Sequence, residues 1–247
     1  MGPLIGLAGI ALEVLLIVHV VRTGRDRIWI WLIIGIPVFG SLAYVVAELL
    51  PELLRGPAGR KARAHATKML DPERAYREAR LRLDTADTVD NRRAVAAQAV
   101  ALGRPEEALQ WLEPARQGLY ANDPALLVGM AQAHFAAARP ERTIAILEEL
   151  RAAHPDFESA DAHLLYTRAL EAAGRQPEAL AEYAALVRYF PGEEARYRQA
   201  EALAAAGDPG AARSVHEEIC RTVERAPAYY RRAQRQWYDL AKRSLGP

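Results

Sequence analysis

The chain has a single cysteine, Cys220, among its 247 residues. One thiol cannot form an intramolecular disulfide, and it also excludes a metal site built from paired Cys-x-x-Cys motifs. Neither sign of charge dominates, because 32 Lys and Arg residues are balanced by 31 Asp and Glu residues. A chain without a strong net field does not attract nucleic acid over long range, so we expect no nucleic-acid partner.

Catalytic and cofactor-binding motifs are also missing. The sequence contains no Gly-x-Ser-x-Gly, no His-Glu-x-x-His, no phosphate-binding loop and no dinucleotide-binding glycine pattern. Two His-Asp pairs are close in sequence, His154 with Asp156 and Asp161 with His163, but the helical period puts them on a surface. We therefore expect no enzyme activity, no cofactor and no bound metal.

Long apolar runs, in contrast, open the chain. Residues 3–21 and 28–47 are each about 20 residues long, the length of a helix that crosses the hydrocarbon core of a bilayer. A secretory signal carries basic residues before its apolar run. No Lys or Arg precedes the first run here, so the run is not expected to be a cleaved signal. The link of residues 22–27 is too short to cross again, so the pattern predicts a two-span hairpin over residues 1–50.

Basic residues beside the two runs set the expected orientation. The link carries three arginines, whereas five Lys and Arg residues follow the second run within residues 55–68. This excess favours a cytoplasmic location for the rest of the chain. Residues 51–70 also contain Gly and Pro, which predicts a basic linker.

The apolar runs resemble a known membrane segment. Residues 19–25, 28–33 and 37–44 look like the N-terminal membrane segment of bacterial cardiolipin synthases and other phospholipase-D-type proteins. That family's catalytic motif, His-x-Lys-x-x-x-x-Asp, is absent from this sequence. The resemblance therefore implies a bacterial inner-membrane location without the catalytic domain of the family.

From Asp71 onward a short element recurs at a period of about 34 residues, which is typical of a helical solenoid. Each copy ends one helix and uses a proline to begin the next. The copies begin at Leu102, Ala138, Ala173 and Ala206. An amphipathic helix over about residues 228–244 is expected to cap the array.

The repeat resembles the tetratricopeptide repeat (TPR). Gly174 and Ala179 match its turn glycine and crossing alanine, whereas Ala138 replaces a turn glycine and His163 stands where a tryptophan is usual. We therefore expect an all-α fold in which a two-helix transmembrane hairpin is followed, over residues 71–247, by a TPR-type solenoid with a C-terminal capping helix.

The TPR resemblance also implies a binding surface, because partner-binding side chains project from the first helix of each pair into a concave groove. In this sequence those positions are Arg93, Ala97, Gln132, Phe135, Arg168, Glu171, Tyr197 and Glu201. The mixture of charged, amide and aromatic side chains suits an extended peptide or a short helix better than a small metabolite. The same residues can also be ordinary exposed helix positions.

We predict from these features a membrane-anchored scaffold whose groove binds a peptide segment of a partner protein in envelope or phospholipid assembly. The expected contacts are thus a protein in the groove and the lipid bilayer around the hairpin. Two alternatives stay open. One is a non-catalytic structural subunit whose hairpin packs beside other membrane helices, and the other is an enzyme of phospholipid metabolism, against which the missing His-x-Lys motif counts.

Overall fold

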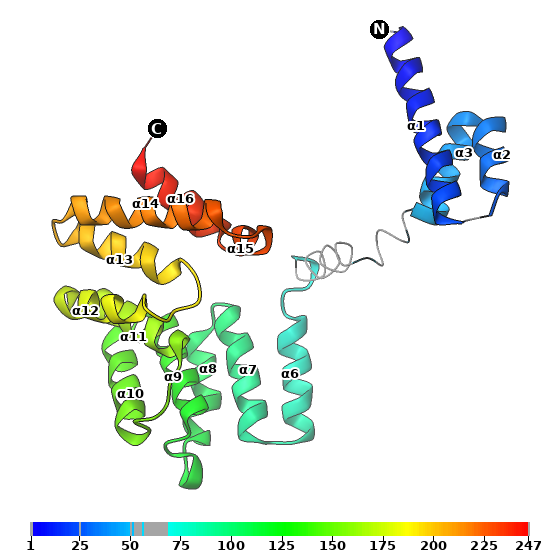
Figure 1. Cartoon of the computed structure of the whole chain (residues 1–247). Helices are drawn as coiled ribbons and strands as arrows, with labels where there is room; N and C mark the ends of the chain where they lie inside the picture. Colours follow the sequence, from blue (N-terminus) through cyan, green and yellow to red (C-terminus); the bar gives the residue numbers. More distant parts are fainter. Residues whose placement is uncertain (1, 25, 50, 52–55, 57–68, 247) are drawn as a thin grey trace. The chain divides into compact units, whose positions relative to one another are not determined.

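The computed structural model describes residues 2–24, 26–49, 51, 56 and 69–246, and only the backbone of residues 2–12, 37 and 38. The described part is helical and contains no strand, which confirms the all-α class. The chain divides into two compact units, unit 1 (Met1–Pro72) and unit 2 (Glu73–Pro247) (Figure 1). The predicted basic linker over residues 51–70 lies almost entirely outside the described residues.

Unit 1 begins with the long helix α1 (Gly2–Thr23). The second apolar run is not one helix, as the sequence predicted, but α2 (Ile28–Gly35), α3 (Pro37–Tyr44) and the π-helical turn η1 (Val45–Leu49). Ile36 between them has φ −137° and ψ 76°, because the proline that follows disfavours a helical conformation there. Among the described residues, no helix has both the length and the hydropathy that crossing a membrane requires. The predicted two-span hairpin thus has no support in the structure.

A close backbone contact holds α2 and α3 together. A Cβ atom on Gly40 would lie 2.0 Å from the carbonyl oxygen of Leu32, a separation that no side chain permits. Only glycine allows this approach, so the bend at Ile36 depends on both Pro37 and Gly40.

Unit 2 is a row of antiparallel helix pairs that follows α6 (Arg74–Thr85). The pairs are α7 (Val89–Ala101) with α8 (Pro105–Leu112), α9 (Pro124–Ala136) with α10 (Pro140–Ala153), α11 (Ala160–Ala172) with α12 (Gln176–Leu186), and α13 (Glu194–Ala205) with α14 (Pro209–Arg225). Two short 3-10 turns, η2 (Glu113–Ala115) and η3 (Gly118–Tyr120), connect α8 to α9.

Local sequence signals explain where these helices begin and end. The side chains of Thr88, Asp123 and Ser159 accept hydrogen bonds from backbone N–H groups in the first turns of α7, α9 and α11, as N-caps do. The second helices carry proline in their first turn, where no N–H is needed. The turn residues have positive φ: Gly103, Ala138, Gly174 and Gly207.

The core of unit 2 is built from leucines and from alanines at the helix crossings. The alanines Ala99, Ala108, Ala131, Ala169 and Ala179 are fully buried. Because alanine has no side chain beyond Cβ, neighbouring helices approach closely at these points, and larger residues such as Leu112, Leu126 and Leu170 fill the space between them.

The C-terminal cap consists of two helices, α15 (Ala228–Ala233) and α16 (Arg235–Leu245). The prediction of one continuous helix was therefore wrong, although its bounds are close to those of the two helices together. α16 packs on α14, with Ala241 buried beside Ile219 and Val223. The break lies at Gln234, whose side-chain Oε1 accepts a hydrogen bond of 2.9 Å from the backbone N–H of Glu193. This tertiary contact bends the cap toward the loop before α13.

Candidate functional site

The first helices of three pairs, α7, α9 and α11, are neighbours along unit 2. A groove of about 690 Å³ follows α7 and α9 and is bordered by the loop between α10 and α11. Its apolar floor includes Val100, Val128 and Gly129. Three of the residues predicted from the sequence, Arg93, Ala97 and Gln132, line this groove together.

The guanidinium of Arg93 uses only part of its hydrogen-bonding capacity. Its Nη1 atom donates to the carboxylate of Asp90 at 2.9 Å, and its side chain is 35% exposed. Its Nε–H is buried and has no hydrogen-bond partner in the part of the chain that the structure describes. The guanidinium therefore keeps donor capacity beside the groove.

Arg168 and Phe135 join α11 to α9. The guanidinium carbon of Arg168 lies 4.8 Å from the centre of the Phe135 ring, within cation–π range. No carboxylate of the described residues forms an ion pair with Arg168. Burial, and then the nearby charge of Arg198, lowers the pKa of the Arg168 guanidinium. The charges of Glu194 and Glu171 oppose this lowering of the pKa. Arg168 is thus a half-buried cation that rests on an aromatic ring and forms no ion pair among the described residues.

Glu171 holds its own helix pair together. Its Oε2 atom accepts a hydrogen bond of 2.9 Å from the hydroxyl of Tyr183, which is fully buried on α12. Burial, followed by the Glu171 carboxylate, raises the pKa of that hydroxyl. Glu171 is therefore committed to the contact between α11 and α12.

Tyr197 and Glu201 on α13 face α14, and Tyr197 also contacts the cap. The ring centre of Tyr197 lies 5.5 Å from that of His216 and 5.6 Å from that of Trp237. A carboxylate oxygen of Glu201 lies 3.3 Å from Nε2 of His216, whose pKa is lowered by burial. The structure brings these two residues together with α14 and α16, and not with the groove along α7 and α9.

A second cavity, of about 630 Å³, lies where the end of α10 meets the start of α11 and the residues after α12. Its lining combines an apolar wall, including Leu147 and Leu150, with the polar side chains of Arg151, His163 and Tyr189. Sequence reasoning did not find this cavity; the one available signal was His163 at a position where the TPR has tryptophan.

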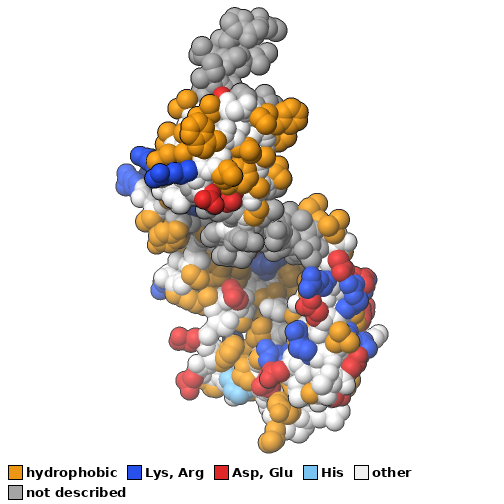
Figure 2. Space-filling view, turned by 90° about the vertical axis from the view of Figure 1, so that its right-hand side faces the viewer, with side chains coloured by type: hydrophobic (Ala, Val, Ile, Leu, Met, Phe, Trp, Pro, Cys, Tyr) orange, Lys and Arg blue, Asp and Glu red, His pale blue; other side chains and the backbone are white. Residues whose placement is uncertain are grey.

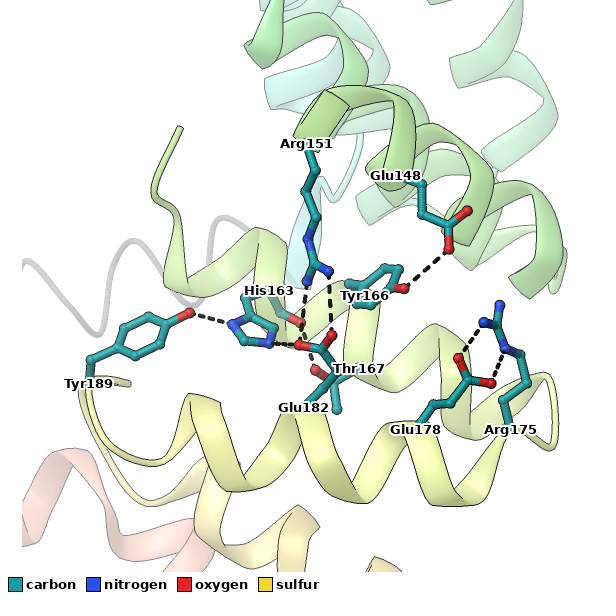
Figure 3. Close-up of polar contacts among 9 residues, drawn as sticks. All are labelled: Glu148, Arg151, His163, Tyr166, Thr167, Arg175, Glu178, Glu182 and Tyr189. Carbon is teal, nitrogen blue, oxygen red and sulfur yellow. Dashed lines mark hydrogen bonds and ion pairs between the residues drawn. The ribbon is translucent and has the colours of Figure 1, made fainter. Parts of the chain in front are cut away.

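Glu182 on α12 is the centre of a polar network beside this cavity (Figure 3). Its carboxylate contacts Nε2 of His163 at 2.5 Å and both terminal nitrogens of Arg151 at 3.3 and 3.4 Å. Because a carboxylate only accepts hydrogen bonds, Nε2 of His163 carries a proton, and in the neutral ring Nδ1 accepts from the hydroxyl of Tyr189. Arg151 also lies over the ring of Tyr166, 4.1 Å from its centre. The network joins α10, α11 and α12.

Metal binding has no basis in the described residues, which contain no group of three or more His, Cys, Asp or Glu side chains placed to hold an ion. No protein-family model and no curated protein matches the sequence.

One solved structure with this fold is the crystal structure of nearly identical TPR-like repeats assigned to a kinesin light chain of Podosopora anserina. It aligns with a TM-score of 0.52 and 18% sequence identity, over 64% of this chain and 86% of that chain. At this identity the likeness shows the fold alone. It confirms the predicted TPR-like helical solenoid and does not extend to the N-terminal resemblance.

Proposed function

We propose that this chain is a protein-interaction scaffold that binds a peptide segment of a partner along α7, α9 and α11. The TPR-like solenoid supports this class of function. The observation that carries the proposal is Arg168, a half-buried guanidinium that rests on Phe135 and has no paired anion in the described part of the chain. A buried charge is unfavourable unless it is paired, so a carboxylate or carbonyl group of a bound peptide would complete this site.

The groove has the chemistry that an extended peptide requires. Arg93 and Gln132 supply side-chain donors for peptide carbonyl groups, and Val100 and Val128 supply apolar surface for alternate side chains. Glu171 belongs to this proposal only as a support for α11, because its carboxylate is already bonded to Tyr183. Tyr197, which contacts Trp237 of the cap, and Glu201, which contacts His216 of α14, would act by holding α13 rather than by touching the peptide.

The finer form of the proposal concerns location and pathway. It places the scaffold at a bacterial inner membrane, with the solenoid on the cytoplasmic side and a partner in envelope or phospholipid assembly. The apolar N-terminal runs and their resemblance to the membrane segment of cardiolipin synthases support this form. In the alternative of a purely structural subunit, the groove would stay empty and unit 1 alone would make the contacts.

Crosslinked capture from native cells tests the groove. We expect the double variant Gln132→Ala with Arg168→Ala to lose its partner, whereas the matched variant Gln110→Ala with Arg142→Ala, on exposed positions of α8 and α10, retains it. Loss of interface anchors typically weakens binding by about 2 kcal/mol or more. Capture by the groove variant at the wild-type yield would show that the peptide does not bind there.

A further inference from the structure

Unit 1 encloses a polar pair within a small apolar core and exposes many apolar side chains on its outside. Nδ1 of His19 lies 2.9 Å from the hydroxyl of Tyr44, which is fully buried, and Ser41 is also buried. On the outside, twelve large hydrophobic side chains are exposed: Val14, Leu15, Val18, Val21, Ile28, Trp31, Leu32, Ile34, Ile36, Phe39, Leu42 and Val46. Figure 2 shows apolar side chains gathered over this unit, with basic side chains at one edge. An exposed apolar surface of this extent is characteristic of an interaction surface.

The unit also has a polar end and an apolar end. The end of α1 meets the start of α2 at one side, and the bend between α2 and α3 lies at the opposite side (Figure 1). Arg22 and Arg27 are exposed at the first side, near the His19–Tyr44 pair and Trp29, whose ring centre lies 5.4 Å from that of Tyr44. The bend, in contrast, exposes Ile36 at 54% and Phe39 at 73%.

The length of the hairpin fits one lipid leaflet. α2 and α3 have eight residues each, which corresponds to about 12 Å at the helical rise. Half of a hydrocarbon core of about 30 Å is about 15 Å. The apolar bend can therefore lie among acyl chains while the polar end stays at the headgroups.

We propose that α2 and α3 insert as a bent hairpin, with Ile36 and Phe39 foremost, into one leaflet of a bilayer, and that the apolar side of α1 contacts the same lipid. The two arginines at the polar end complement anionic headgroups, and the half-buried Trp29 lies at the level where aromatic rings favour the interface. This inference rests on the membrane location in the proposed function and adds the inserted residues and their depth. Within the described length of α1, the half-buried Glu13 and His19 interrupt the apolar pattern.

Vesicle flotation of the full chain tests the insertion. With vesicles of phosphatidylcholine and phosphatidylglycerol, we expect Ile36→Asp with Phe39→Asp to weaken partitioning about a hundredfold, because a charge within the hydrocarbon is strongly unfavourable. The matched control is Leu119→Asp, which replaces a 99% exposed apolar side chain of unit 2 and should partition as the wild type does. Acyl chains that carry bromine should quench part of the tryptophan fluorescence, mainly that of Trp31, which is 75% exposed, and Trp31→Phe should reduce this quenching.

Three results would overturn the insertion. They are wild-type partitioning of the double Asp variant, vesicle binding without quenching by brominated acyl chains, and a dimer in vesicle-free buffer that the double Asp variant converts to monomer. The last result would show that a second copy of the chain covers this face. Failure here is distinct from failure of the groove, since the double Asp variant in detergent should still capture the partner and the Gln132–Arg168 variant should still float.

Discussion

Ala138 is the residue at which a single change should stabilise the solenoid. It has φ 55° in the turn between α9 and α10, where the corresponding residues of the other pairs are glycines. Its N–H donates to the carbonyl of Phe135 at 3.0 Å, just as the N–H of Gly174 donates to Glu171 at 3.0 Å. The backbone thus requires the same left-handed conformation at both turns, but only at Ala138 does a Cβ atom oppose it.

The magnitude follows from two opposing terms. An L-residue in the left-handed region costs about 1–2 kcal/mol. Replacing alanine by glycine also costs roughly 0.5–1 kcal/mol of stability, because glycine has greater conformational freedom in the unfolded chain. We therefore expect Ala138→Gly to raise the free energy of unfolding by about 0.5–1 kcal/mol. Gly174→Ala should lower it by a similar amount, because a Cβ there meets no atom within 4 Å and only the φ of 75° opposes it.

Urea denaturation of the full chain, followed by circular dichroism, measures both variants. The midpoint should rise for Ala138→Gly and fall for Gly174→Ala, with the slope unchanged. A lower midpoint for Ala138→Gly would refute the reasoning, since it would mean that the methyl group of Ala138 stabilises the turn by more than its conformation costs.

Two other predictions concern partly buried polar contacts. Glu182→Ala should lower the free energy of unfolding by about 1–2 kcal/mol, because Arg151 and His163 lose a shared acceptor. Glu178→Ala should change it by no more than about 0.5 kcal/mol, because Glu178 is 53% exposed and, among the described residues, pairs only with Arg175. Equal effects of the two variants in urea denaturation would contradict the network. Burial and the Glu193 carboxylate raise the pKa of Tyr230 to about 12, so the stability that this hydroxyl contributes is complete below the unfolded pKa of about 10 and is lost as the pH rises toward 12. Tyr230→Phe should therefore lose less stability than the wild type over this range of pH, and parallel unfolding curves would show that the contact is unimportant.

The groove illustrates how far local signals reach. The TPR resemblance predicts Arg93, Ala97 and Gln132 on the inner faces of α7 and α9, and the structure has all three on one groove. The same resemblance treats Tyr197 and Glu201 as equivalent positions, yet their surroundings differ because α14 and α16 lie beside them. The described residues after α14 do not repeat the pattern, so periodicity alone contains no information on how the cap packs there.

The sequence by itself determined the helix pairs of this protein, because prolines, turn glycines and N-caps act within a few residues, and because leucines and alanines at helical spacing leave one way to bury them. Only the tertiary structure decided the bend of the second apolar run, where Gly40 meets Leu32, the break at Gln234, where a side chain bonds to Glu193, and the network of Arg151, His163 and Glu182. In each of these cases the contact joins groups on different elements. Such contacts depend on how the helices pack, which the local pattern does not specify.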